Sequence, residues 1–224
     1  MLSLPEEFLL LALDDQKGSF AAFTDYGLAG AVLVELLLRD AITVGPKGEV
    51  LAGSSPQGDA ALDAALAAIG QLKKPKKLQE WVGSLPGRCK TLKPAVLDGL
   101  VAQGVLRRED RRFLRVFAYT RYPEADGAPE DAIVGRLRRV LLDGQEPDGR
   151  TAALIGLLHG CQMDASVLRN RAERKTAKPI LDRITKGDIV SSAVSSAVAA
   201  AIAAACSAAM TCCIAASVAA SSSS

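Results

Sequence analysis

The amino-acid sequence predicts a mainly α protein: a single compact helical domain with small β-hairpins, followed by an Ala/Ser-rich C-terminal helix and tail. Three observations support this prediction. Long apolar segments have helical spacing, the β-prone segments are short and paired around turn residues, and from Asp188 on the sequence becomes low in complexity. A chain of 224 residues fits one ordinary domain. We therefore expect residues 1–187 to form the domain and residues 188–224 the additional helix and tail.

Two helices are expected in the first 40 residues. The first begins at residues 3–7 (SLPEE), where serine can cap the helix, proline suits the first turn and the carboxylates favour the helix dipole. The second, residues 26–38 (YGLAGAVLVELLL), is apolar almost all round. This pattern indicates a buried central helix.

Two short β-hairpins are expected, each after a helix. Residues 41–52 (AITVGPKGEVLA) contain two β-prone runs around a Gly-Pro-Lys-Gly turn. Residues 105–122 give a second strand, turn and strand. Between the hairpins the sequence predicts helices at residues 59–69 and 75–82, and another from about Lys90.

The C-terminal part is expected to be helical. An amphipathic helix starts at Pro129, residues 151–159 form a short apolar helix, and residues 164–185 form a longer polar one. The Ala/Ser-rich segment predicts a final helix to about Cys206 and then a frayed tail. Because this segment is uncharged over more than 20 residues, a transmembrane anchor is the alternative, although Ala, Ser and Thr drive insertion less than Leu, Ile and Phe.

Charges are unevenly distributed, although the formal net charge is only +2. Residues 1–71 contain three basic and ten acidic side chains, whereas residues 72–93 contain seven basic side chains and one acidic. Six arginines follow within residues 107–121. A charge run usually marks a solvated face, and its functional interpretation is a surface that faces anions. Any preference for a polyanionic partner must come from this local clustering.

No catalytic or metal-binding arrangement stands out in the sequence. The motifs of hydrolases, zinc proteases and nucleotide-binding loops do not occur, and His159 with Cys161 supplies only two metal ligands. We therefore expect no enzyme activity, no cofactor and no metal. The five cysteines lack the spacing of a disulfide framework, and the acidic first residues do not resemble a signal peptide. The expected location is cytoplasmic.

Four segments, taken in order, carry a resemblance to a known family: LSLPEEFLLLALDDQKGSF, YGLAGAVLVELLLRDAITV, LVAQGVLRRED and RRFLRVF. They are similar to the Golgi phosphoprotein 3 family, including its compact bacterial members, over roughly residues 2–185. The resemblance implies a mostly helical, peripheral membrane protein that binds phosphatidylinositol 4-phosphate from the cytosolic side. Eukaryotic members use this binding to hold glycosyltransferases in the Golgi, so the resemblance also implies client membrane proteins and an adaptor role.

The same resemblance implies a lipid headgroup site. In eukaryotic members this site uses a tryptophan, an arginine nine residues later, and two arginines spaced i, i+3. The tryptophan position falls on Phe20 and the single arginine on Ala29, while the arginine pair falls on Lys90 and Lys93. Lysine keeps the charge but lacks the guanidinium fork that grips phosphate oxygens. These departures favour a phosphate-bearing anionic lipid over strict specificity for the 4-phosphate.

Both lysines are expected at the mouth of a helix, whose first-turn N–H groups attract anions, with Arg88 on the same exposed face. The alternative interpretation is that the lysines are merely solvated.

Residues 112–122 (RFLRVFAYTRY) correspond to the family's apolar hairpin, which serves membrane insertion or self-association. Here Phe113, Phe117 and Tyr119 alternate with basic residues such as Arg115. Aromatic side chains next to arginines suit an interface with lipid headgroups, and they equally suit a homo-oligomer contact. The alternative is an ordinary hairpin packed on its own core.

Two other function classes compete with lipid binding. A helix followed by a β-hairpin, occurring twice, is typical of winged-helix DNA-binding proteins, with residues 107–115 as a wing. Neither helix before a hairpin has a basic recognition face, so no nucleic-acid partner is expected. A scaffold that binds only proteins, through the hairpin and the tail, is the third interpretation.

Overall fold

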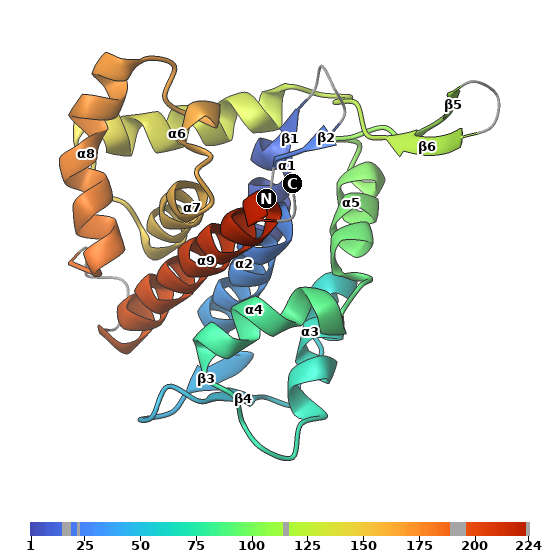
Figure 1. Ribbon diagram of the computed structural model, residues 1–224, viewed down its shortest axis with the longest axis vertical. Coiled ribbons are helices and arrows are strands. Elements are labelled where there is room, and N and C mark those ends of the chain that lie inside the picture. Colours follow the sequence, from blue (N-terminus) through green and yellow to red (C-terminus); the bar gives the residue numbers. More distant parts are fainter. Residues whose placement is uncertain (15–18, 22, 114–116, 189–195, 223–224) are drawn as a thin grey trace.

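Helices make up most of the chain in the computed structural model of this protein, which describes residues 1–14, 19–21, 23–113, 117–188 and 196–222 (Figure 1). Within these residues, nine α-helices and a single 3₁₀ turn accompany three two-stranded antiparallel sheets. The mainly α fold class predicted from the sequence is confirmed.

The elements follow one another along the chain without long interruptions. The helices are α1 (Leu4–Ala12), α2 (Thr24–Leu38), α3 (Ala60–Gly70), α4 (Leu78–Arg88), α5 (Leu92–Ala102), α6 (Ala128–Asp143), α7 (Gly149–Gly160), α8 (Arg171–Lys186) and α9 (Ser196–Ser222), with a 3₁₀ turn at Asp164–Ser166. The strands are β1 (Leu13–Asp14), β2 (Ser19–Phe20), β3 (Ile42–Val44), β4 (Val50–Ala52), β5 (Glu109–Phe113) and β6 (Phe117–Arg121).

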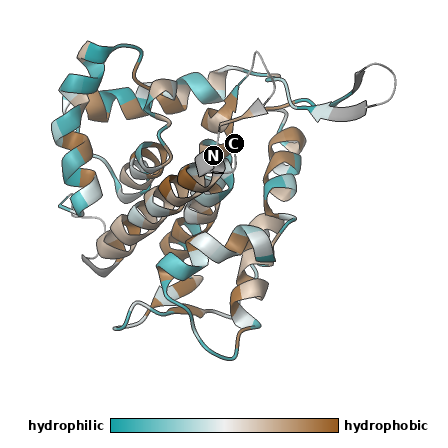
Figure 2. Ribbon diagram, viewed as in Figure 1, coloured by the Kyte–Doolittle hydropathy of each residue, from teal (hydrophilic) through white to brown (hydrophobic). Residues whose placement is uncertain are grey.

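Helix α2 lies at the centre of the fold, as its apolar sequence predicts. It packs against α1, α4, α7 and α9, and every residue from Gly27 to Leu37 is buried. Figure 2 shows apolar residues concentrated on α2, α7 and α9. A Cβ atom at Gly27 would collide with the ring of Phe8, so glycine lets α1 lie directly against α2. These helices form the core on which the shorter elements are arranged.

Two buried carboxylates, Glu7 of α1 and Glu35 of α2, pair with arginines of later helices. Arg150 donates from Nη1 to Glu35 Oε2 at 2.6 Å, and Arg136 donates from Nη2 to Glu7 Oε2 at 2.7 Å. Arg150 also donates from Nη2 to the carbonyl oxygen of Leu2 at 2.6 Å. Removing one partner of a buried ion pair costs about 3–5 kcal/mol, since the other charge stays desolvated. This network of ion pairs and hydrogen bonds therefore stabilises the position of α1 against the central helix α2.

Both predicted hairpins are present. Strand β3 pairs with β4 from Ile42↔Ala52 to Val44↔Val50, and β5 pairs with β6 from Glu109↔Arg121 to Phe113↔Phe117. The β5–β6 hairpin extends away from the helices in Figure 1. A third, shorter pair, β1–β2, was not predicted from the sequence.

Helix α4 begins later and ends later than residues 75–82, the range that the sequence predicts. It starts at Leu78 because the preceding residues are held along the first hairpin: Val50 N donates to Lys76 O at 2.8 Å, and Lys77 bridges to Glu49. The helix then continues through Pro86, near its C-terminal end, to Arg88.

The single helix predicted over residues 164–185 is wrong. The chain forms a short 3₁₀ turn at Asp164–Ser166, and α8 starts only at Arg171. Asn170 sets this start, because its side-chain oxygen accepts from the amide of Glu173 at 2.9 Å. Arg138 of α6 holds the connection in place by donating to Val167 O at 2.7 Å and to both carboxylate oxygens of Glu173.

The frayed tail predicted after Cys206 is also wrong, because α9 continues as one helix to Ser222. It packs against α2, α4 and α7, and Ala208, Ala209 and Cys213 are buried beyond the expected end. Small side chains allow this close packing. Among the described residues, Val198–Ala219 is the one helical segment long and apolar enough to cross a membrane, with mean hydropathy 2.1, and part of it is buried in the fold.

Candidate anionic headgroup site

A hollow of about 230 Å³ lies where α4 ends and α5 begins, beside the start of α2. The short connection 89–91 between the two helices forms one side of it. Its lining residues are Asp25, Leu28, Pro86, Cys89, Lys90, Leu92, Lys93 and Pro94. Two of the predicted headgroup residues, Lys90 and Lys93, therefore share one cavity.

Lys93 is in the first turn of α5 and contacts two residues from distant parts of the sequence. Its Nζ lies 4.0 Å from the centroid of the Phe20 ring, which is a cation–π contact. The same Nζ lies 3.5 Å from Asp25 Oδ1, where it forms an ion pair. The structure thus brings Phe20 to Lys93, although Phe20 is on β2 and 73 positions earlier.

Lys90 and Arg88 are both exposed but lie differently with respect to the hollow. Lys90 lines the cavity, and no ion pair joins it to another residue in the part of the chain that the structure describes. Arg88 is the last residue of α4 and is not among the lining residues, so the structure does not bring it into the hollow with the two lysines. A cation at a helix C-terminus is favoured by the helix dipole, which gives Arg88 a local role.

The first turn of α5 offers fewer amide donors than its sequence predicts. Leu92 N already donates to Cys89 O at 3.1 Å, and Pro94 has no N–H. No side chain caps this helix start. An anion bound here would therefore be recognised mainly by the two lysine side chains, with the Lys93 amide as a further donor.

Asp25 is the residue of this site that the sequence does not reveal. It lies in the first turn of α2, where an acidic residue is explained by the helix dipole alone. In the fold it faces Lys93 and compensates part of the positive charge of the hollow. Ala29, one turn further along α2, is fully buried, so the position that carries an arginine in eukaryotic members contributes no cation here.

The hairpin residues of the second predicted interface are described in part. Phe113, Phe117 and Tyr119 lie on β5 and β6, whose backbones pair as predicted, and Arg115 is outside the described residues. The lipid or homo-oligomer contact proposed for residues 112–122 stays a prediction.

His159 and Cys161, weighed above as metal ligands, face different partners. His159 Nδ1 lies 3.0 Å from Asp164 Oδ1, and this carboxylate raises the pKa of His159 above its ordinary value of 6.5. Cys161 is buried, and its Sγ lies 3.7 Å from that of Cys213 on α9. No group of three or more metal-ligating side chains occurs among the residues that the structure describes.

Comparison with known proteins agrees with the resemblance seen in the sequence. The family model for Golgi phosphoprotein 3 (GPP34) matches residues 4–201. A relative from Eremothecium gossypii, vacuolar protein sorting-associated protein 74, is 30% identical over 166 residues, which cover 63% of this chain and 49% of that protein. The chain thus spans about half the length of this curated relative. Since the family model covers most of the sequence, the chain belongs to the Golgi phosphoprotein 3 family.

Proposed function

We propose that the protein is a peripheral membrane protein that binds the headgroup of an anionic phospholipid, phosphatidylinositol 4-phosphate or a similar phosphate-bearing lipid. The headgroup phosphate would bind between Lys90 and Lys93, beside the ring of Phe20. This role needs no catalysis, and we propose that the protein acts by binding alone, as an adaptor for client membrane proteins at the cytosolic face.

The observation that carries the proposal is the shared hollow at the α4–α5 connection. Two lysines line it, and Lys93 is positioned by contacts with Phe20 and Asp25. Ammonium groups bind phosphate as point charges, without the bidentate geometry that arginine provides. The site therefore suits recognition by charge more than by headgroup stereochemistry.

Asp25 sets a limit on the strength of this binding. With Lys90 and Lys93 opposed by one carboxylate, the hollow carries about one net positive charge. A phosphate must compete with Asp25 for Lys93, so one headgroup would bind weakly. Additional contacts with the membrane, such as those predicted for the hairpin of residues 112–122, would then be needed for stable attachment.

Family membership and the relative's name support a role in membrane traffic. The relative is described as associated with vacuolar protein sorting, and the matching family is that of a Golgi phosphoprotein. An adaptor that recognises a lipid on one organelle and a client in the same membrane is consistent with both descriptions.

Vesicle co-sedimentation tests the proposal. Neutral vesicles are compared with vesicles that contain phosphatidylinositol 4-phosphate, phosphatidylglycerol or cardiolipin. We expect binding to the anionic vesicles, and we expect the double variant Lys90→Ala/Lys93→Ala to weaken it at least about tenfold, because each lysine near an anionic surface contributes roughly 1 kcal/mol.

The matched control is Lys73→Ala/Lys74→Ala, which removes the same charge from exposed residues outside the hollow. If both double variants lose affinity equally, attraction is diffuse and the headgroup site is wrong. If neither loses affinity, another surface or a protein partner carries the function.

A further inference from the structure

A second hollow, of about 610 Å³, lies at the opposite end of α4 from the headgroup site. Its walls come from three elements that are far apart in the sequence: the β3–β4 turn at residues 44–48, the start of α4 at residues 77–79, and three alanines of α9. The size is within the range of small-molecule sites in proteins, roughly 300–1,000 Å³.

Backbone hydrogen bonds hold the walls of this hollow together. Leu78 N donates to Gly48 O at 3.2 Å, which ties the start of α4 to the turn. Within the turn, Gly48 N donates to Gly45 O at 2.9 Å and Gly45 N donates to Glu49 O at 2.8 Å. The cavity is therefore shaped by the fold itself and needs no rearrangement of these elements before a ligand enters.

The α9 wall of the hollow is apolar and consists of small side chains, those of Ala200, Ala201 and Ala204. Val44 of the hairpin and Leu78 of α4 add apolar lining. A row of alanines leaves room along the helix surface that leucine or phenylalanine would fill. This wall suits an aliphatic chain, which gains free energy when its surface leaves water.

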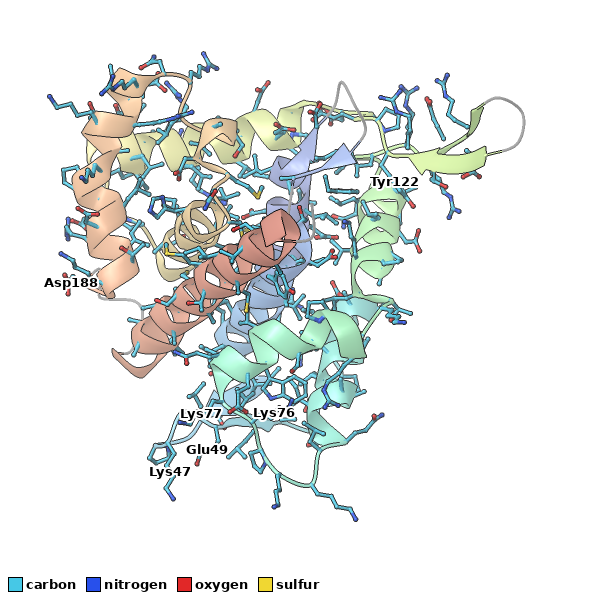
Figure 3. All side chains as sticks on the ribbon, viewed as in Figure 1. Lys47, Glu49, Lys76, Lys77, Tyr122 and Asp188 are labelled. Atoms are coloured by element: carbon cyan, nitrogen blue, oxygen red, sulfur yellow. The ribbon has the colours of Figure 1, made fainter. Side chains whose placement is uncertain are left out.

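The lining that comes from the hairpin turn and the start of α4 is positive. Lys47 and Lys77, both exposed, line the hollow, and no acidic residue is among its described lining residues. Glu49, the acidic residue of this hairpin, is engaged by the turn, since its Oε2 accepts from the Lys47 amide at 2.9 Å. Figure 3 shows Lys47 and Lys77 at the same end of the molecule, on the hairpin and at the start of α4.

The start of α4 adds further donors to this positive wall. Lys77 is the N-cap residue, and no side chain caps the helix. The Leu78 amide already donates to Gly48 O, whereas the later N–H groups of a first helical turn have no acceptor within the helix, and the positive end of the dipole favours an anion there. Gln79, in this first turn, lines the hollow.

We propose that this hollow binds a single-chain amphipathic carboxylate, of the fatty-acid class. The aliphatic chain would lie along the alanines of α9, and the carboxylate would meet Lys47, Lys77 and the start of α4. Charge complementarity selects this ligand class, because the cavity joins an apolar wall of small residues to a wall with two ammonium groups. The site is separate from the hollow at Lys90 and does not depend on headgroup binding.

Isothermal titration calorimetry with decanoate, below its micellar concentration, tests the proposal on the full chain. Decanol and acetate serve as probes that have only the chain or only the carboxylate. We expect saturable decanoate binding, and about fourfold tighter binding for each methylene added between octanoate and decanoate. We expect decanol and acetate to bind at least about tenfold more weakly than decanoate.

Decanoate binding to substituted proteins tests whether the ligand occupies this hollow. Lys77→Gln and Lys47→Gln should each weaken decanoate binding several-fold, and Ala200→Trp, which fills the cavity from an exposed position on α9, should abolish it. Lys73→Gln and Lys93→Gln are charge-matched controls outside this hollow and should leave binding within about twofold. Circular dichroism and thermal melting check that each variant folds.

Three results would overturn the proposal. One is the lack of saturable decanoate binding to the parent protein. Another is unchanged binding in the folded Lys77→Gln and Ala200→Trp variants. The third is loss of binding in Lys93→Gln, which would place the carboxylate in the hollow between α4 and α5.

Discussion

Individual side chains in this protein owe their roles to partners that are distant in the sequence. Asp25 would be an ordinary helix-start residue without Lys93, and Phe20 would be one more apolar residue of a short strand. The resemblance to the family identified the positions of Phe20, Lys90 and Lys93, whereas nothing in the sequence indicated Asp25. The opposing carboxylate could not be predicted, because its contact joins two helices whose relative placement depends on the whole core.

His159 and Asp164 predict a pH-dependent contribution to stability at the residue scale. The carboxylate of Asp164, and more weakly that of Asp182, raises the pKa of His159 in the folded protein above 6.5. This contribution is therefore fully present below the unfolded-state pKa, and it is lost as the pH rises through the folded-state pKa.

We expect His159→Gln to lower the free energy of unfolding more at pH 5.5 than at pH 9, as measured by urea denaturation. Asp164→Asn should remove the same pH dependence. An equal loss at both pH values would mean that His159 acts only through packing.

The sequence predicted the helices and hairpins correctly where their ends depend on local chemistry. Asp59 caps α3 through the amides of Ala61 and Leu62, and this helix starts where the sequence predicts. The predictions failed where contacts between residues distant in the sequence determine where a helix begins. Examples are the start of α4 at Leu78 and the connection before α8, which Arg138 holds in place. The final helix was predicted, but its end at about Cys206 was wrong, since alanine and serine give no strong periodic signal and the packing of small residues against α7 is a property of the fold.

Because α9 is buried beyond Cys206, we expect truncation of its C-terminal half to destabilise the protein. Removing residues 207–224 exposes the surface that Ala208, Ala209 and Cys213 cover, and we expect a loss of roughly 3 kcal/mol. For a domain of this size that corresponds to a fall in melting temperature of about 6–12 °C.

Removing only residues 215–224 is the control for this experiment. Ala215, Ser217 and Val218 in this stretch are exposed, so the melting temperature should fall by no more than about 3 °C. Equal melting temperatures for both truncated proteins would show that the second half of α9 does not contribute to the core. Differential scanning calorimetry provides the measurement.

The whole molecule separates its charges along the chain. The acidic first 71 residues build the region from α1 to α3. The basic residues of the stretch 72–93 lie on the connection before α4, at the end of α4, on the connection to α5 and in the first turn of α5. The headgroup hollow opens within this basic stretch. Because attraction between exposed charges is screened over a Debye length of about 8–10 Å near physiological salt, a surface of this kind should bind membranes in a salt-dependent way.

We predict that binding to anionic vesicles falls strongly between low and high salt, while a smaller part of the affinity remains. Phe117→Ala should reduce mainly this remaining part, because aromatic burial among headgroups is not screened. Co-sedimentation of the parent and of Phe117→Ala at about 0.05 M and 0.5 M salt provides the measurement. Salt-independent binding of the parent would contradict an electrostatic attachment.

The arginine at position 150 also has a consequence for how the chain folds as it is made. Arg150 pairs with Glu35 and with the carbonyl of Leu2, a separation of 148 positions. Glu35 also pairs with Arg39, four residues later, but its contact with Arg150 cannot form until about two thirds of the 224 residues have been synthesised. Contacts of such long range slow folding, because a large loop must close before they form. On the ribosome, α1 and α2 therefore complete their packing only after the start of α7 has been synthesised, which is late in translation.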